Sequence, residues 1–180
     1  MGGGSVEEWS GGRLTHVDEH GKAHMVDVTG KPLTRRIAEA RCSVRTTADL
    51  DAVLRESLGG SNLVETARFS GMLAAKKTAS LIPLCHPIPI DGVTVDIEVL
   101  RDGFRIIAVA EVTERTGVEM EALTACAAAA LVLLQPLLET DPHASIEALT
   151  LWRKTGGRSG SWQRSEAGGM SREGRTSLSR

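Results

Sequence analysis

The stretch that decides the fold is Val93-Thr94-Val95-Asp96-Ile97-Glu98-Val99, with Asp102-Gly103 shortly after it and then Phe104 to Thr113. Apolar and polar side chains alternate in the first run, which predicts a strand with one buried face. The Asp-Gly pair is a signal for a tight turn between strands. The sequence therefore predicts an antiparallel hairpin over residues 93–113.

Upstream of the hairpin, the sequence predicts one strand and two helices. Residues 40–46 alternate polar and apolar side chains, which indicates a short strand. Thr46 or Thr47 is expected to cap the first helix. The apolar stripe of that helix would be Leu50, Val53, Leu54 and Leu58, with Gly59-Gly60 as its end. Asn62, with a glutamate three residues later, predicts a capping box for a second helix over about 63–79.

Downstream of the hairpin, the sequence predicts one long helix and one strand. The helix begins near Gly117 or Val118 and is rich in alanine, the residue that most favours a helix, up to about Leu134. Pro136 removes a backbone donor and crowds the preceding turn, so the helix is expected to kink or stop there. Residues 146–153 read as the last strand.

The predicted order is strand, helix, helix, strand, strand, helix, strand. One antiparallel sheet with helices on one face is the economical way to pack these elements. The expected fold class is therefore α+β, a ferredoxin-like sandwich. Whether a second subunit covers the other face of the sheet is left open by the sequence.

The length of 180 residues suits a single domain with some additional sequence at both ends. We expect a flexible, Gly-rich arm over 1–13, a folded domain over 14–164 and a disordered tail over 165–180.

Composition and charge exclude several classes of protein. A net charge of −2 and 3% aromatic residues argue against a general nucleic-acid binder. We expect no membrane partner, because no purely apolar run reaches the ~20 residues of a membrane span. The first residues do not resemble a signal peptide, and three widely spaced cysteines fit reduced thiols better than a disulfide framework. These features predict a cytoplasmic protein.

The segment from Lys76 to Pro87 carries the strongest local indication of a binding site. Two lysines are followed by Pro83-Leu84-Cys85-His86-Pro87, and each proline pushes the residue before it toward extended geometry. The segment is therefore expected to be a stiff loop that holds an imidazole beside two ammonium groups, an arrangement that suits an anionic ligand.

Histidines and aspartates are frequent near the N-terminus, and a metal site is one interpretation of them. The candidates are His16, Asp18, His20, His24 and Asp27. Imidazole and carboxylate are metal ligands, but the segment has neither a cysteine pair nor an HExxH helix. An extended arm facing a ligand, or a solvated loop, explains the same residues, and we expect no metal site.

Several blocks in one order resemble the signature blocks of the MoaC family, the cyclic pyranopterin monophosphate synthases. The blocks are Leu14-Thr15-His16, Ala23-His24-Met25-Val26-Asp27-Val28, Leu81-Ile82-Pro83-Leu84-Cys85-His86-Pro87, Thr116-Gly117-Val118-Glu119-Met120-Glu121-Ala122-Leu123-Thr124-Ala125 and Lys154-Thr155-Gly156-Gly157-Arg158-Ser159-Gly160. The resemblance runs from about residue 14 to 160 without a large insertion.

This resemblance implies both an assembly and a reaction. It implies a ferredoxin-like subunit in a homo-oligomer, a hexamer built from dimers with sites at the dimer interfaces. The reaction rearranges a GTP-derived, 3′,8-cyclised dihydroguanosine triphosphate into a cyclic pyranopterin and releases pyrophosphate, in molybdenum-cofactor biosynthesis. No cofactor is implied, although Mg²⁺ can accompany the triphosphate.

The resemblance also implies roles for individual residues. Catalytic roles fall on Lys76, His86, Glu119 and Glu121. Substrate contacts fall on His24, Asp27, Arg36, Leu84, Cys85, Met120, Lys154 and Arg158. Taken singly, each has a structural explanation, such as a solvated helix end for a lysine or a helix N-terminal charge for a glutamate. Their joint presence in the order of the family favours binding.

Three positions depart from the pattern of the family. Gly60 stands where the family usually has a catalytic lysine. In the long helix, Gln135 replaces an aspartate and Leu138 replaces a lysine. Glutamine cannot act as a carboxylate base, and leucine can neither carry a proton nor neutralise a phosphate. Groups that could substitute are Glu139, Arg68, Lys77 and Asp141.

Three hypotheses about function follow. The chain is a synthase whose catalytic groups have been relocated, a divergent enzyme that acts on a related cyclised nucleotide, or a nucleotide-binding paralogue without turnover. Loss of even one general acid or base typically lowers a rate by ~100–10,000-fold, so the departures bear directly on which of these holds.

Overall fold

The computed structural model describes residues 16–18, 20–56, 62–157 and 160–165. The predicted arm over 1–13, the predicted tail from 166 onward, Gly59-Gly60 and Arg158 lie outside the described residues.

The described residues form one five-stranded antiparallel sheet in the order β2-β3-β1-β4-β5. The strands are β1 (Thr34–Arg45), β2 (Gly92–Leu100), β3 (Gly103–Glu114), β4 (Ser145–Thr155) and β5 (Trp162–Gln163). The helices are α1 (Leu50–Glu56), α2 (Leu63–Ala75), α3 (Thr78–Leu81) and α4 (Glu119–Leu137). The α+β, ferredoxin-like prediction is confirmed.

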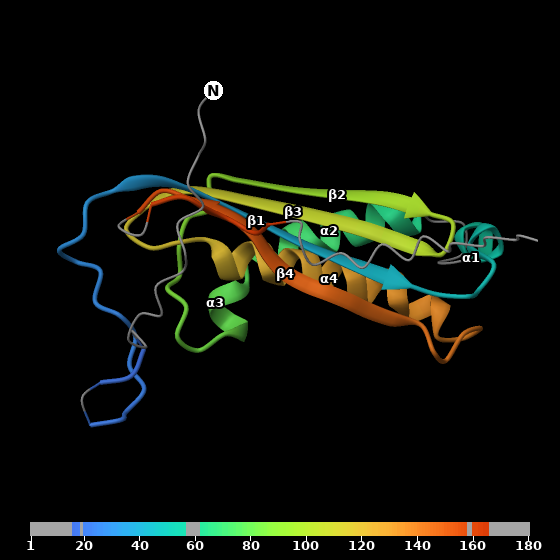
Figure 1. The fold of residues 1–180 in the computed structure, drawn as a ribbon, viewed down its shortest axis with the longest axis horizontal. Coiled ribbons are helices and arrows are strands. Elements are labelled where there is room, and N and C mark those ends of the chain that lie inside the picture. Colours follow the sequence, from blue (N-terminus) through green and yellow to red (C-terminus); the bar gives the residue numbers. More distant parts are fainter. Residues whose placement is uncertain (1–15, 19, 57–61, 158–159, 166–180) are drawn as a thin grey trace, which may run out of the picture.

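Helices α2 and α4 lie side by side on one face of the sheet, while α3 and α1 lie at its two opposite ends (Figure 1). We call these the α3 end and the α1 end. Strand β1 and helix α4 both run from the α3 end to the α1 end, so each element carries residues to both. The α3 end holds the start of α4, and the α1 end holds its last turn.

Small side chains bring the two layers close together. Alanines supply much of the buried core, including Ala38 and Ala40 of β1, Ala108 and Ala110 of β3, and Ala122, Ala125, Ala129 and Ala130 of α4. Where α2 crosses α4, a Cβ on Gly71 would come within 2.8 Å of the carbonyl oxygen of Ala125.

Helix α4 is long and apolar enough to cross a membrane by length and composition. In the structure, however, one of its sides packs on the sheet as the central core helix.

The hairpin of β2 and β3 forms as predicted, with Leu100 opposite Gly103. Gly103 has a φ of 142°, and a Cβ there would overlap the carbonyl of Val44, so this turn requires glycine. The capping role predicted for Asn62 is also confirmed, because its side chain accepts a hydrogen bond of 3.1 Å from the backbone of Glu65.

Other boundaries differ from the predictions. Strand β1 begins at Thr34 rather than residue 40, because pairing with β3 extends it through the charged residues that interrupt the alternation. Helix α1 is capped by Asp49, whose carboxylate accepts from the backbone of Ala52, and not by Thr46 or Thr47. Pairing with β1 likewise lengthens β4 at both ends, and the short strand β5 was not predicted.

Two helix ends also differ. Helix α2 ends at Ala75, and a break at Lys76 and Lys77 separates it from α3, where the sequence predicted one helix. Helix α4 continues past Pro136 to Leu137, because the missing donor affects only the last turn.

Candidate binding site at the α3 end

The larger of two hollows at the α3 end has a volume of about 300 Å³. It brings together three of the four residues with implied catalytic roles, Lys76, His86 and Glu121. The other lining residues are Ala75, Thr78, Ala79, Ser80, Pro87, Ile88 and Ile90. A break in the helical layer and the proline loop therefore place a cation, an imidazole and a carboxyl around one space.

The local structure explains how this hollow is built. The hydroxyl of Thr78 is buried and donates a hydrogen bond of 2.9 Å to the carbonyl of Ala75, which fixes the break between α2 and α3. The prolines keep residues 83–90 out of helix and strand, so the chain returns past the N-terminus of α4 in irregular form. Lys76 is exposed at the rim, and His86 is half-buried.

Glu121 is the one buried ionisable group of this hollow, with only 4% of its surface exposed. Burial raises the pKa of its carboxyl to about 7, and the nearby charge of Glu119 adds to this effect. Both protonation states are therefore populated near neutral pH, which is the condition for a group that exchanges protons with a ligand.

A smaller hollow with room for about one water molecule lies beside the first, and it gathers Arg36, Glu119 and Lys154. The Nζ of Lys154 lies 3.3 Å from the Oε1 of Glu119. Arg36 is fixed by two backbone carbonyls, with its Nε 2.8 Å from the oxygen of Glu114 and its Nη2 3.1 Å from that of Arg115. Cations that are held in place in this way suit a phosphate ligand.

Two glycines leave room for side chains beside the smaller hollow. A Cβ on Gly157, which has a φ of 76°, would overlap the guanidinium of Arg36. A Cβ on Gly117 would overlap the carboxylate of Glu119, which therefore lies directly against the backbone. Gly117 and Thr78 were not predicted to shape the site. Gly117 could have been found, because it lies inside a signature block. Thr78 could not, because no sequence pattern marks a single threonine after two lysines as part of a site.

The structure leaves the other predicted contact residues outside both hollows. His24 and Asp27 are exposed on an extended segment, where hydrogen bonds from Thr29 lower the pKa of Asp27. Arg115 ties this segment to the α3 end through a 2.5 Å hydrogen bond to the carbonyl of Thr29. Leu84, Cys85 and Met120 also line neither hollow. Cys85 nevertheless lies close enough to Glu121 for that charge to raise the pKa of its thiol, after the larger effect of burial.

Within the described part of the chain, no group of three or more His, Cys, Asp or Glu side chains is placed to hold a metal ion. The hollows at the α3 end bring together two carboxyls, one imidazole and three cations, groups that are able to bind an anion and exchange protons with it.

At the α1 end, the positions that depart from the family carry no acid or base. Gln135 is exposed, Leu138 is 46% exposed, and Gly60 lies outside the described residues. Along α4, Leu138 is about 25 Å from Glu121 at 1.5 Å per residue. The two ends therefore cannot contribute to one small-molecule site within a single chain.

Two of the substitutes suggested by the sequence are engaged in the fold. The carboxylate of Asp141 accepts hydrogen bonds from Thr46 and Thr47 at 2.7–3.0 Å and from the backbone of His143 at 3.0 Å. Arg68 donates to the carbonyl of Val95 at 2.9 Å and pairs with a glutamate on its own helix. Glu139 remains exposed at the α1 end, and Lys77 lines neither hollow.

Comparison with known proteins is consistent with this geometry. Residues 25–157 match the MoaC family. The chain is 46% identical over 154 residues to cyclic pyranopterin monophosphate synthase of Streptomyces avermitilis, covering 85% of this chain and 91% of that protein. A synthase of Novosphingobium aromaticivorans gives the same identity, covering 85% and 98%. Cyclic pyranopterin monophosphate synthase 2 of Mycobacterium tuberculosis is 45% identical over 162 residues, covering 88% and 96%.

The signature blocks, the ferredoxin-like sheet and this degree of identity over nearly the whole length of the relatives agree. The chain belongs to the MoaC family.

Proposed function

We propose that this protein acts in molybdenum-cofactor biosynthesis as a cyclic pyranopterin monophosphate synthase. Its substrate would be a GTP-derived, 3′,8-cyclised dihydroguanosine triphosphate, and its products a cyclic pyranopterin and pyrophosphate. The observation that carries the proposal is the identity of about 46% to proteins of that name over 85% of the chain. The gathering of Lys76, His86 and Glu121 around one hollow supports it.

The arrangement of charges suggests a division of roles. Arg36 and Lys154 would bind the phosphates beside the smaller hollow, and Lys76 would do so at the rim of the larger one. Glu121 and His86 would move the protons needed for ring opening and closure. The reaction needs no cofactor in this proposal. Mg²⁺ would enter only as a companion of the triphosphate.

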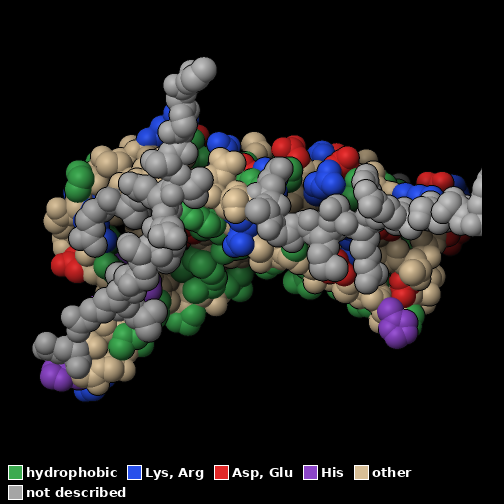
Figure 2. All heavy atoms as spheres, in the orientation of Figure 1, with side chains coloured by type: hydrophobic (Ala, Val, Ile, Leu, Met, Phe, Trp, Pro, Cys, Tyr) green, Lys and Arg blue, Asp and Glu red, His purple; other side chains and the backbone are tan. Residues whose placement is uncertain are grey.

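The proposal includes a homo-oligomer with sites at subunit interfaces, a hexamer built from dimers in the cytoplasm. Large apolar side chains are exposed on neighbouring helices, with Phe69 66% and Leu73 54% exposed on α2 and Leu131 58% exposed on α4. Figure 2 shows further hydrophobic side chains at the surface over α3 and the start of α4. A second copy that covers such surfaces would bury these apolar side chains in a subunit interface.

The departures at Gln135 and Leu138 favour a second candidate function. A chain without these two ionisable groups would keep the phosphate-binding α3 end and lose the standard turnover. It would then be a nucleotide-binding paralogue, or an enzyme for a related cyclised nucleotide whose chemistry needs fewer proton transfers.

A coupled assay separates these functions. The cyclised triphosphate is made with the upstream radical enzyme, this protein is added, and pyranopterin and pyrophosphate are followed by mass spectrometry. Product that appears with the wild type and disappears with Lys76→Ala supports the synthase. Lys77→Ala is the matched control, because it removes the same charge one residue away without touching either hollow.

Intact substrate would overturn the synthase proposal, and calorimetry then decides between the remaining functions. Binding of the cyclised triphosphate without product supports the paralogue without turnover. The double variant Gln135→Asp/Leu138→Lys gives an independent check. A gain in turnover on restoring these groups identifies them as the missing chemistry. Unchanged turnover in an active protein means that other groups have taken their place.

Light scattering tests the assembly. A hexamer has six times the 19.2 kDa of one chain. A monomer in solution would contradict the interfacial site.

A further inference from the structure

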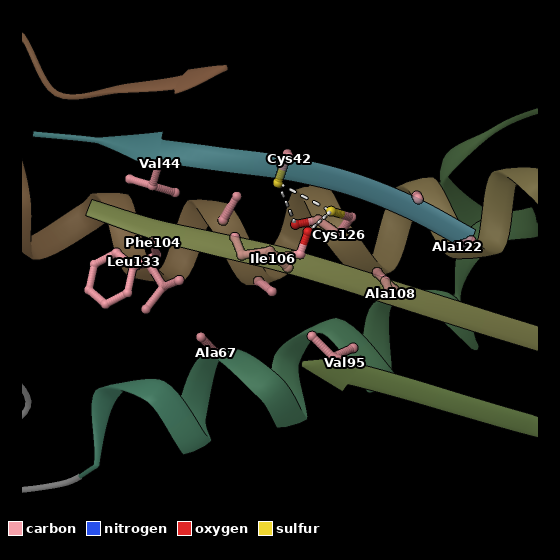
Figure 3. Packing of buried hydrophobic residues seen from close by; sticks show 14 of the residues in the cluster. Cys42, Val44, Ala67, Val95, Phe104, Ile106, Ala108, Ala122, Cys126 and Leu133 are labelled. Carbon is pink, nitrogen blue, oxygen red and sulfur yellow. Dashed lines mark hydrogen bonds between the residues drawn. The ribbon is translucent and has the colours of Figure 1, made fainter. Parts of the chain in front are cut away.

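Two cysteines from distant parts of the chain meet in the core. Cys42 lies on β1 and Cys126 on α4, 84 residues apart, and their sulfur atoms are 3.2 Å from each other. Cys42 is 3% exposed and Cys126 is fully buried. Figure 3 shows both side chains pointing into the space between the strand and the helix, with Ile106 of β3 close to them. The third cysteine, Cys85, is half-buried in the proline loop and forms no part of this pair.

Hydrogen bonds orient the two thiols toward each other. The Cys126 thiol donates to the sulfur of Cys42, and backbone carbonyls of Cys126 and Ile106 lie 3.8 Å from the Cys42 and Cys126 sulfurs respectively. The donated bond lowers the pKa of Cys42, whereas the same contact and burial raise that of Cys126. The two thiols are therefore unequal, and Cys42 is the one that more readily becomes a thiolate and attacks an oxidant.

We propose that Cys42 and Cys126 form a redox-sensitive dithiol that hydrogen peroxide converts into a disulfide between β1 and α4. The Cys42 thiol loses its proton, and the thiolate attacks one peroxide oxygen, breaks the O–O bond and becomes a sulfenic acid. The hydroxide that leaves takes up the proton lost by Cys42 and forms the first water. The sulfur of Cys126 then attacks that of Cys42, loses its proton and displaces the second water. Two thiols are oxidised and one peroxide is reduced to two waters, so atoms and electrons balance.

Geometry and access both constrain the reaction. Closing the bond requires the sulfur atoms to approach from 3.2 Å to about 2.05 Å, a shortening of about 1 Å. Because both thiols are buried, the oxidant must be small or the layers must open locally. Peroxide, which is close to water in size, meets this condition, and glutathione disulfide does not.

The disulfide would tie together the two elements that carry much of the candidate site. Strand β1 carries Arg36, and α4 carries Glu119 and Glu121. A cross-link that closes a long loop also stabilises the fold against unfolding, here by on the order of a hundredfold in the unfolding equilibrium. This inference does not rest on the proposed function, because it concerns only thiol chemistry within the core.

The test uses the full-length chain in a Cys85→Ser background, so that Cys42 and Cys126 are the only thiols. The folded protein is treated with hydrogen peroxide, then denatured without reductant, alkylated and weighed by mass spectrometry. The expected result is the loss of two hydrogen atoms, no alkyl adducts and a cross-linked peptide that joins the two cysteines. Urea unfolding of the oxidised form should have a higher midpoint, and dithiothreitol should reverse it.

A matched variant and a second oxidant sharpen the test. Adding Cys42→Ala leaves a single thiol, for which no loss of two hydrogens is expected. Glutathione disulfide should leave two alkylatable thiols in the folded Cys85→Ser protein. Two adducts after peroxide treatment, or oxygen atoms added to Cys42 or Cys126 without a cross-link, would overturn the proposal.

Discussion

The two ends of α4 use their polar residues in opposite ways. At its N-terminal end, Glu119 and Glu121 face hollows that also hold Lys76, His86 and Lys154. At its C-terminal end, Gln135 and Leu138 are exposed and carry no charge, and the nearby carboxylate of Asp141 is held by Thr46 and Thr47. One end gathers ionisable groups around two hollows, and the other uses its carboxylate to hold the fold together.

This difference teaches that the positions that match the family and two of those that depart from it lie in separate parts of the fold. At the α3 end, Arg36, Glu119 and Lys154 line one small hollow, and Gly157 leaves room there for the guanidinium of Arg36. The α1 end lies about 25 Å away along the helix and would meet an α3 end only in an assembly. If the proposed function holds, substitutions at the α1 end would change turnover while binding at the α3 end persists.

The largest expected effect is on turnover when the buried carboxyl at the α3 end is removed. Glu121→Gln should lower kcat in the coupled assay by ~100–10,000-fold, because the amide keeps the shape of the side chain but transfers no proton. Glu139→Gln, at the other end, should lower kcat by less than tenfold. If kcat falls as far in Glu139→Gln, then Glu139 is the substitute carboxylate. The contrast between a catalytic α3 end and a structural α1 end would then be wrong.

The same substitution should change the pH dependence of stability. The carboxyl of Glu121 has a pKa of about 7 in the folded protein against 4.5 ordinarily, so between these values the folded state holds a proton that the unfolded chain has lost. The folded state therefore loses stability as pH rises from 4.5 to 7. The ionisation of this one group lowers the free energy of unfolding by about 3 kcal/mol at most.

Glu121→Gln removes this dependence. The urea midpoint of the variant should rise relative to that of the wild type between pH 5 and pH 8, and Glu139→Gln, which removes one exposed carboxyl, controls for net charge. Parallel midpoints for Glu121→Gln and wild type over this range would show that Glu121 is not desolvated in solution.

Asp141→Asn tests the structural use of the α1 end. Hydrogen bonds from the backbone of Thr47 and the hydroxyl of Thr46 lower the pKa of Asp141 to about 2, so its stabilising effect is present above pH 4 and is lost as pH falls toward 2. At pH 7 the variant should melt lower by on the order of 5 °C in calorimetry. Ligand affinity at the α3 end should be unchanged, and a weakened affinity would show that the ends are coupled.

Gly117→Ala is expected to have the smallest effect. The added methyl would displace the flexible carboxylate of Glu119 rather than the backbone, so the melting temperature should hardly change. Turnover should fall by about tenfold, because Glu119 would leave its position beside Lys154. Gly92→Ala is the control, since a Cβ there meets nothing within 4 Å. Equal turnover in both variants would remove Glu119 from the mechanism.

Local patterns in the sequence were enough to predict the hairpin, the cap at Asn62 and the irregular loop around Pro83 and Pro87, because neighbouring residues decide these features. The signature blocks predicted the family and some of the residues that line the hollows, but they also pointed to Leu84, Cys85 and Met120, which line neither. The same patterns failed where pairing with a distant strand decides where a strand begins or whether it forms. Examples are the early start of β1 and the short strand β5. They also assigned the cap of α1 to Thr46 or Thr47, whose hydroxyls bind Asp141, about 95 residues away.

The sequence by itself therefore determined the fold class, the family and the identity of the candidate ligand-binding residues. Only the tertiary structure decided which of these residues meet, that Glu121 is buried enough to titrate near neutral pH, and that Asp141 belongs to the fold. It alone also brought Cys42 against Cys126. The physical reason is that burial, desolvation and sulfur contact depend on elements far apart in the chain, and local periodicity carries no information about which distant elements pack together.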